Sequence, residues 1–177
     1  MKSKCRVDVS IGAAVLYPIL YFLDESGLFS VLLPAVCIHE LGHWAAIAAL
    51  NGSVTAIRLD AAGLCMESAG IGGKYEEAFC ALVGPAAGFV LFLIASAFPY
   101  QWAHKCAGVS LLLSLFNLLP AVPLDGGRLL LVLTGSMYAV KISSAASALL
   151  LTAAAIHWKS YALLIPAVLI IRGMISP

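Results

Sequence analysis

A short group of ionisable side chains lies inside a long apolar run of this sequence. The run extends from Leu28 to Leu50 and contains His39-Glu40-Leu41-Gly42-His43. Positions i and i+4 of a helix lie on one face, so His39 and His43 could both offer an imidazole nitrogen to one ion. Glu40 follows the first histidine and could accept a proton from water at that ion. This combination is typical of metal-assisted hydrolysis.

The surroundings of the motif decide how it is interpreted. In a soluble helix the same five residues could simply form a charged surface face. Here an apolar segment, Val31–Ile38, precedes the motif, and Trp44-Ala45-Ala46-Ile47 follows it. An ionisable side chain at the centre of a bilayer costs about 3 kcal/mol and is therefore usually functional. The sequence thus favours a buried zinc site over a charged surface.

The composition indicates an integral membrane protein in contact with the lipid bilayer. Of 177 residues, 62% are hydrophobic and 11% are charged, whereas about a quarter of a typical soluble domain is charged. The net charge of +1 argues against nucleic acid as a partner. The five cysteines show no C-x-x-C spacing, and we interpret them as free side chains.

Several apolar segments predict an all-α membrane protein with about six transmembrane helices. Lysine and arginine at positions 2, 4 and 6 precede the first segment and predict a cytoplasmic N-terminus. Six crossings would also return the C-terminus to the cytoplasm, with the metal site toward that side. The expected crossings are residues 7–23, 28–50, 78–100, a fourth element from 106, 142–158 and 161–174, and the sequence leaves open whether residues 129–140 continue the fourth element or form a separate span.

Between the second and third crossings the apolar pattern changes from a helical to a strand period. Thr55, Ile57 and Leu59 alternate with other residues, and alternation resumes at Leu64 after a turn. This pattern predicts a small β-hairpin with one apolar face at the membrane surface. Two interpretations stay open: a plain cytoplasmic connection, or an edge strand that could pair with an extended peptide through main-chain bonds.

The fourth element contains a stretch that cannot continue as a regular helix. Residues 117–128 read Asn-Leu-Leu-Pro-Ala-Val-Pro-Leu-Asp-Gly-Gly-Arg, and proline and glycine disfavour helix interiors. Irregular backbone at membrane depth is tolerated only where it is buried in protein or lines a wet cavity. We therefore expect a broken fourth helix that belongs to a site. Asp125 could supply a third metal ligand, or it could cap a helix that begins before Arg128.

Together the two motifs resemble the site-2 protease family of intramembrane zinc metalloproteases. The similarity is closest to the short bacterial members, which include sporulation-type enzymes that process sigma-factor precursors. It covers about residues 28–135, and Gly84-Pro85 also matches a common feature of the family. The resemblance implies one Zn²⁺ held by His39, His43 and Asp125, with Glu40 as the general base.

The resemblance also implies a substrate and a location. It assigns substrate positioning to Asn117, Pro120 and Pro123. The family cleaves membrane-spanning or membrane-associated proteins in regulated intramembrane proteolysis, so we expect a multi-pass protein of the bacterial cell membrane with its active site toward the cytoplasm. We expect residues 1–177 to form a single intramembrane metalloprotease domain, without the PDZ or CBS domain of many relatives. A homo-oligomer is compatible with the sequence, which does not determine the oligomeric state.

Two rival hypotheses remain. One is a different membrane metalloprotease that takes a downstream glutamate as its third ligand; it fits poorly, because Glu67, Glu76 and Glu77 lie in a loop and at the edge of a span. The other is a non-proteolytic metal transporter or adaptor with the same ligands. A transporter is expected to repeat polar sites along a path, whereas this sequence contains one deep polar centre.

Overall fold

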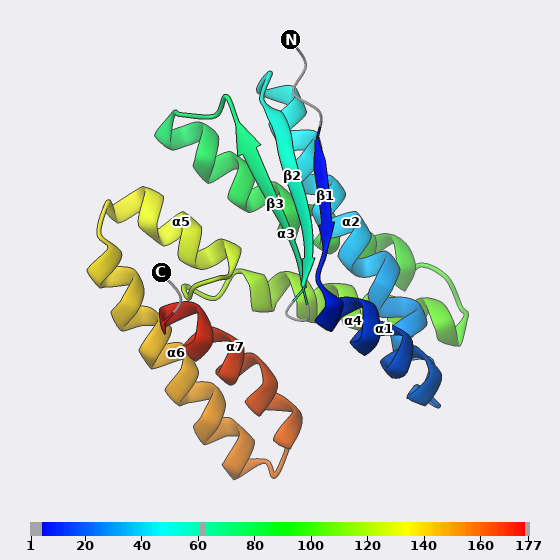
Figure 1. The fold of residues 1–177 in the computed structure, drawn as a ribbon. Coiled ribbons are helices and arrows are strands. Elements are labelled where there is room, and N and C mark those ends of the chain that lie inside the picture. Colours follow the sequence, from blue (N-terminus) through cyan, green and yellow to red (C-terminus); the bar gives the residue numbers. More distant parts are fainter. Residues whose placement is uncertain (1–4, 61–62, 176–177) are drawn as a thin grey trace.

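The computed structural model describes residues 5–60 and 63–175. These residues form a mostly helical protein with a small sheet on one side (Figure 1). The α-helices are α1 (Ile11–Leu23), α2 (Leu28–Ala49), α3 (Lys74–Ser96), α4 (Gln101–Asn117), α5 (Asp125–Thr134), α6 (Met137–His157) and α7 (Leu164–Ile175), and a 3-10 turn (Tyr161–Leu163) precedes α7. The strands are β1 (Arg6–Val9), β2 (Ser53–Asp60) and β3 (Gly63–Ala69).

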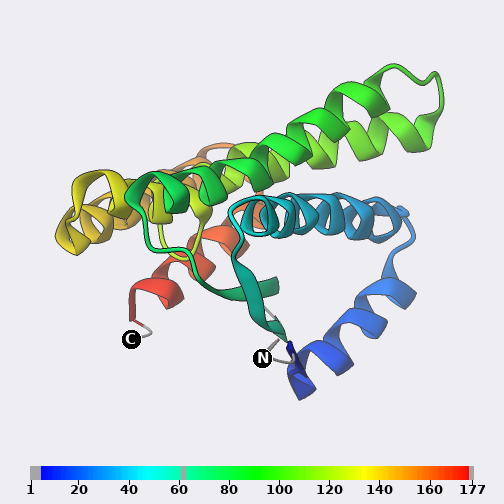
Figure 2. The same ribbon diagram turned by 90° about the horizontal axis from the view of Figure 1, so that it is seen from above.

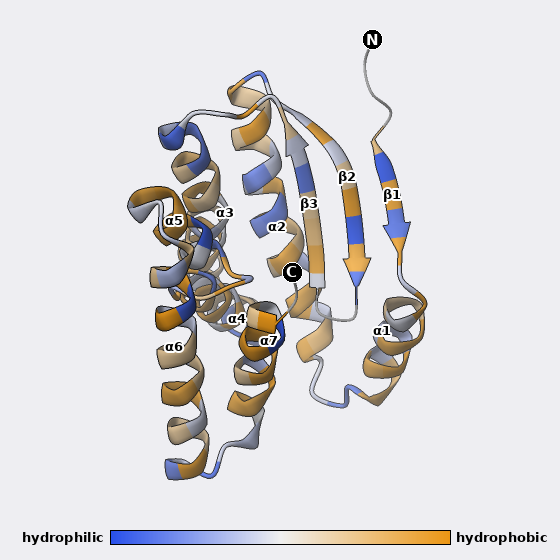
Figure 3. Ribbon diagram, turned by 60° about the vertical axis from the view of Figure 1, so that its left-hand side comes forward, coloured by the Kyte–Doolittle hydropathy of each residue, from blue (hydrophilic) through white to orange (hydrophobic). Residues whose placement is uncertain are grey.

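Three of the described helices, α2, α3 and α6, are long and apolar enough to cross a membrane. Two further helices, α1 and α7, are apolar but shorter. At a rise of 1.5 Å per residue, α1 is only about 20 Å long, whereas a bilayer core is about 30 Å thick. Most helices carry apolar surface along their length, and hydrophilic residues interrupt the middle of α2 (Figure 3). The expectation of a mostly helical membrane protein is therefore confirmed in this coarser form.

The segment that was expected to cross first, residues 7–23, begins as a strand. β1 pairs in parallel with β2, and α1 starts only at Ile11, where the hydroxyl of Ser10 accepts a hydrogen bond from the backbone N–H of Ala13. Arg6 and Asp8 alternate with valines and pair with each other at 2.8 Å. This alternation is typical of a strand. It covers only four residues, so the long apolar segment that follows dominated the prediction and the strand was missed.

Two further boundaries differ from the sequence-based prediction. Residues 101–105, expected as an outer loop, form the first turn of α4. Residues 129–140 do not form one helix: Gly135 adopts a left-handed conformation with φ of 65° and ends α5, and the hydroxyl of Ser136 then caps α6. Glycine reaches this conformation without steric cost, which makes it a common helix terminator.

The sheet confirms the predicted hairpin and extends it by one strand. Its order is β1-β2-β3, with β2 and β3 antiparallel. Since β3 is last in this order, one of its edges has no strand partner among the described residues. The sheet and α1 lie on the side of α2 that faces away from α3 and α4 (Figure 2). This arrangement places α2 between a helical layer and the sheet.

The helices bury mainly small side chains where they pack together. One cluster joins Val31 of α2 to Ala95 of α3 and to Cys106 and Ala107 of α4. Small residues allow close approach of membrane helices, where packing rather than exclusion from water drives association. The helical layer therefore gives α2 a firm support on one face.

Candidate metal centre

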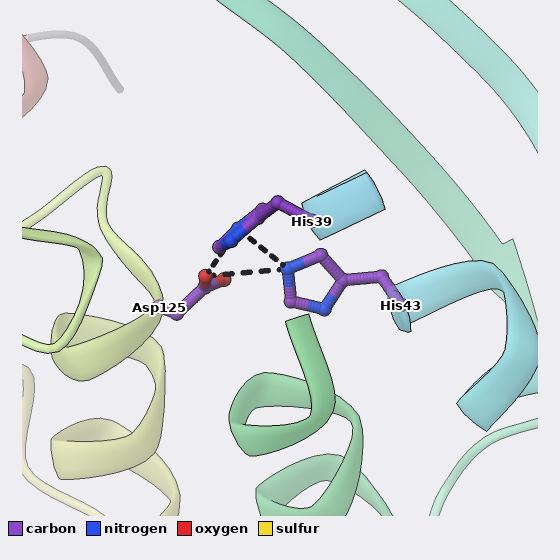
Figure 4. Close-up of side chains that lie close together, drawn as sticks. All are labelled: His39, His43 and Asp125. Atoms are coloured by element: carbon purple, nitrogen blue, oxygen red, sulfur yellow. Dashed lines mark hydrogen bonds and ion pairs between the residues drawn. The ribbon is translucent and has the colours of Figure 1, made fainter. Parts of the chain in front are cut away.

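Two histidines of α2 meet an aspartate from the start of α5. The Nε2 atom of His39 lies 3.1 Å from Asp125 Oδ2, and the Nε2 atom of His43 lies 3.2 Å from the same oxygen (Figure 4). The two Nε2 atoms are 3.2 Å apart. Within the described part of the chain, these three residues form the one group of histidine, cysteine and acidic side chains that is arranged to hold a metal ion. The three residues predicted as ligands are thus brought together.

The spacing of the three atoms suits one tetrahedral ion. Ligand atoms at about 2.1 Å from zinc lie roughly 3.4 Å from one another in a regular tetrahedron. The distances of 3.1 and 3.2 Å between these atoms are close to that value. A tetrahedral ion at this place would keep its fourth position free of protein, which is the arrangement of catalytic zinc sites.

The hydrogen bonding of His43 also indicates a cation. Its Nδ1 atom lies 2.8 Å from the carbonyl oxygen of Cys80, which can only accept, so Nδ1 carries the proton and donates. In the neutral ring, Nε2 then presents a lone pair toward the Asp125 carboxylate, itself an acceptor. Two facing acceptors are favourable only with a metal ion or a shared proton between them. Metal-bound histidines commonly donate their other N–H to a carbonyl in this way.

Close packing between α2 and α3 determines where the His43 ring lies. A Cβ atom on Gly42 would come within 2.7 Å of the Val83 carbonyl oxygen, and a Cβ on Gly84 would overlap the His43 ring. The backbone of α3 therefore forms the support beneath this imidazole. His39, one turn earlier, is only 3% exposed. The His43 ring thus rests on α3, and the His39 ring is buried.

Asp125 is the first residue of α5, and its side chain does not cap the helix. The N-cap residue is Leu124, which makes no side-chain cap bond. The alternative role for Asp125, a helix cap, is therefore not observed, and its carboxylate instead contacts the two histidines. Gly126 and Gly127 are buried against the backbone of residues 118–122, where a Cβ would clash. The turn that presents Asp125 thus packs tightly on itself.

Residues 118–124 are not helical and are held in place by α6. The hydroxyl of Ser143 donates to the carbonyl oxygen of Pro120, and the backbone N–H of Val122 donates to Ser144 Oγ at 3.0 Å. Ser144 is fully buried and donates in turn to the Val140 carbonyl at 2.7 Å. Unpaired backbone groups are costly in an apolar interior. Two adjacent serines therefore replace the helical hydrogen bonds that this segment lacks.

Glu40 reaches the same cavity as the three candidate ligands. The cavity has a volume of about 170 Å³ and also borders β3. Glu40 thus lines this cavity without being one of the three candidate ligands. A general base has to reach water at the ion, and this role of Glu40 stays a prediction. The other lining residues are Leu64, Cys65, Met66, Asn117, Pro123, Leu124 and Arg128.

The three residues predicted to position substrate lie in different places. Asn117 and Pro123 line the cavity. The Nδ2 atom of Asn117 donates to the Leu113 carbonyl at 3.0 Å, which points the amide N–H₂ group back along α4. Pro120 is absent from the described lining of this cavity, and its carbonyl faces Ser143 on α6. The substrate-positioning role of all three stays a prediction.

Several residues that shape the site were missed at the sequence level. The adjacent serines at 143 and 144 stand in an apolar helix and could have been noticed as polar groups that need a partner. Cys80 gave no signal, because its contribution is a backbone carbonyl that every residue possesses. The sequence predicted an edge strand in this region, but it did not predict that part of β3 would line the metal-site cavity.

Parts of the chain are similar in sequence to known metalloproteases. Residues 97–157, which include Asp125, match the family model described as Peptidase family M50. The chain is 34% identical over 127 residues to "Putative zinc metalloprotease Rip3" from two strains of Mycobacterium tuberculosis, and this match covers 64% of the chain. It covers 32% of those relatives, so the chain spans about a third of their length.

A solved structure shows the same fold over almost the entire chain. "Site-2 Protease from Methanocaldococcus jannaschii" superposes with a TM-score of 0.69 at 22% sequence identity, covering 98% of this chain and 90% of that chain. The resemblance to the site-2 proteases that the two motifs indicated is therefore confirmed by an independent sequence match and by the fold.

Proposed function

We propose, from the premise that this chain resembles the site-2 proteases in sequence and in fold, that it is a zinc-dependent intramembrane endopeptidase. The observation that carries the proposal is the convergence of His39, His43 and Asp125 on one point in a cavity that Glu40 also lines. Its substrates would be membrane-spanning or membrane-associated proteins, cut in regulated intramembrane proteolysis.

Each residue of the site has a distinct role in the proposed reaction. One Zn²⁺ held by His39, His43 and Asp125 would supply a Lewis acid that activates water and polarises a peptide carbonyl. Glu40 accepts the proton of the attacking water and passes it to the departing amine. The Cys80 carbonyl keeps the His43 ring in the tautomer that leaves Nε2 available.

The substrate has to be extended before it can be cut. A membrane helix hides its carbonyls in hydrogen bonds, so the segment to be cleaved unwinds. The cavity is bordered by Leu64, Cys65 and Met66 of β3, whose outer edge has no strand partner among the described residues. An extended peptide can pair with such an edge through main-chain bonds. Asn117 and Pro123 would then contact the substrate directly, and Pro120 would act by shaping the segment between them.

We further propose a six-span arrangement in the bacterial cell membrane, with residues 1–177 acting as one domain whose core is 28–135. In it α4 and α5 form one broken fourth crossing, and both termini and the active site face the cytoplasm. Single cysteines placed at Lys141 and Lys159, in a chain whose own cysteines are replaced, test the arrangement. An impermeant thiol reagent should label position 159 from outside intact cells and position 141 only after the membrane is opened. Labelling of both from the same side would refute this topology.

The decisive experiment compares variants of the proposed base and of the third ligand. Glu40→Gln should retain zinc and lose cleavage of a co-expressed membrane substrate by about 10³-fold, because the proton acceptor is removed. Asp125→Ala should lower the zinc content of the purified protein, as measured by elemental analysis. Glu25→Gln, in the turn between α1 and α2, is the control and should change neither value.

Two results would count against the proposal. Full activity of Glu40→Gln would remove Glu40 from the mechanism, and unchanged zinc in Asp125→Ala would remove that residue from the ligand set. Wild-type protein that holds zinc but cuts none of a broad panel of single-span and membrane-anchored proteins would instead favour the non-proteolytic alternative.

A further inference from the structure

A second cavity adjoins the metal centre on the side of α7. It has a volume of about 450 Å³ and shares His39, Glu40 and Asn117 with the metal-site cavity. Its walls are otherwise mainly apolar, with Leu113 and Phe116 contributed by α4. A cavity that is continuous with the reacting position and large enough for side chains is a place for the residues of a substrate that flank the cut bond.

Two charges of opposite sign line this cavity beyond the metal site itself. Arg172 comes from α7 and Asp60 from the end of β2. Among the described residues, no carboxylate forms an ion pair with Arg172, and this includes Asp60. Arg172 is an exposed residue, and its guanidinium can bind a carboxylate through charge-assisted, bidentate hydrogen bonds.

The residue after Arg172 packs closely against the segment that leads into Asp125. A Cβ atom on Gly173 would lie 2.8 Å from Pro123 Cδ and 3.0 Å from the Val122 carbonyl oxygen, so α7 approaches the 118–124 segment closely at this point. That segment leads directly into Asp125. The backbone next to Arg172 is therefore positioned by its contact with the segment that carries Asp125.

We propose that Arg172 forms a specificity subsite that binds an acidic side chain of the substrate, close to the bond that is cut. The proposal rests on the proposed proteolytic function and names a class of substrate for it: extended membrane segments with an aspartate or glutamate on the α7 side of the cleavage position. Asp60, at the end of β2, lines the same cavity and repels a carboxylate near it. The apolar residues of the walls take an uncharged neighbouring side chain.

The position of Arg172 predicts which kinetic constant its substitution should change. It lines the flanking cavity and is not among the residues of the metal-site cavity. Its contribution should therefore be to substrate binding and should appear in KM, with kcat nearly unchanged. One charge-assisted hydrogen bond corresponds to about a tenfold preference for an acidic over a neutral side chain.

The test profiles cleavage by the full chain in lipid vesicles. The probe is a library of single-span peptides whose residues around the helix end are randomised, and the products are identified by mass spectrometry. Wild-type protein should enrich aspartate and glutamate about tenfold at one position of its products. Arg172→Gln should abolish this enrichment, and Arg172→Glu should replace it with enrichment of lysine and arginine at the same position.

A matched control separates recognition from general membrane electrostatics. Lys141 is an exposed cation of α6 that lines neither cavity, and Lys141→Gln changes the net charge by the same amount as Arg172→Gln. It should leave the cleavage profile unchanged. An equal loss of acidic preference in Lys141→Gln, or an unchanged profile in Arg172→Glu, would overturn the inference.

A binding measurement distinguishes failure of this inference from failure of the proposed function. The Glu40→Gln chain is titrated with two single-span peptides that differ only by glutamate or glutamine at the flanking position. Tighter binding of the glutamate peptide, lost in the Glu40→Gln/Arg172→Gln double variant, supports the subsite even if no cleavage is detected. Equal binding of the two peptides refutes the subsite even if the wild type cuts both.

Discussion

The two faces of α2 differ in how tightly they are packed. On the face toward α3 and α4, His39 is 3% exposed and Ala46 is 2% exposed, and Gly42 lies against the α3 backbone. On the face toward the sheet, Leu41 is 54% exposed and Trp44 is 53% exposed. One helix therefore presents a closely packed face and an open face within the same two turns.

The difference corresponds to two requirements of the proposed chemistry. Metal ligands have to be held within a few tenths of an ångström, and the small residues of α3 supply that support. An incoming substrate needs room, and a cavity of about 450 Å³ remains between the open face and the strands. Glu40 lines both this cavity and the one at the metal site. The proposed base thus stands where the packed and the open side meet.

The largest change in zinc content and stability is expected when a larger side chain is placed in the contact between α2 and α3. Gly84→Val would push a side chain into the space of the His43 ring, and we expect zinc content to fall by at least about tenfold, with a loss of about 3 kcal/mol in stability. Elemental analysis and thermal unfolding in detergent measure the two effects. Gly108→Val is the matched control, since a Cβ there meets nothing within 4 Å. Normal zinc content in Gly84→Val would show that this contact does not position the ligand.

An intermediate effect is expected from the serines that hold the segment before Asp125. Ser144→Ala leaves the Val122 N–H without its acceptor, which should cost about 1–3 kcal/mol and speed the release of zinc to a chelator. Thr152→Val, on the same helix, removes a hydroxyl that donates only within α6 to Ala148. If both variants release zinc equally fast, the serine acts on overall helix stability and does not position the aspartate.

The smallest effect on the folded protein is expected on the open face. Trp44→Ala should change stability by about 0.5 kcal/mol or less and should leave zinc content unchanged, because the side chain is half exposed. The KM for a membrane substrate should rise by about threefold to tenfold if the open cavity receives it. Trp158→Ala, an exposed tryptophan outside this cavity, is the control. A loss of zinc in Trp44→Ala would erase the distinction between the two faces.

Local patterns determined a large part of this protein. The spacing of His39 and His43 places both rings on one face because the helical period is a property of the backbone. The strand period after Gly52 predicted the β2–β3 hairpin, which is confirmed. Proline and glycine predicted an interruption of the helix within residues 117–128; residues 118–124 are indeed not helical, whereas Gly126 and Gly127 lie in α5.

Other features depend on contacts between distant segments, for which the sequence holds no local signal. The strand at Arg6–Val9 exists because β2 offers it an edge, although the residues that follow are helical. The tautomer of His43 depends on the Cys80 carbonyl, a group that is chemically the same at every residue. The packing of α6 and α7 on the 118–124 segment decides which proline lines the metal-site cavity and places Arg172 in the adjoining one. Residue types and spacing thus determined which atoms could bind the ion, and only tertiary packing decided how they are held and what surrounds them.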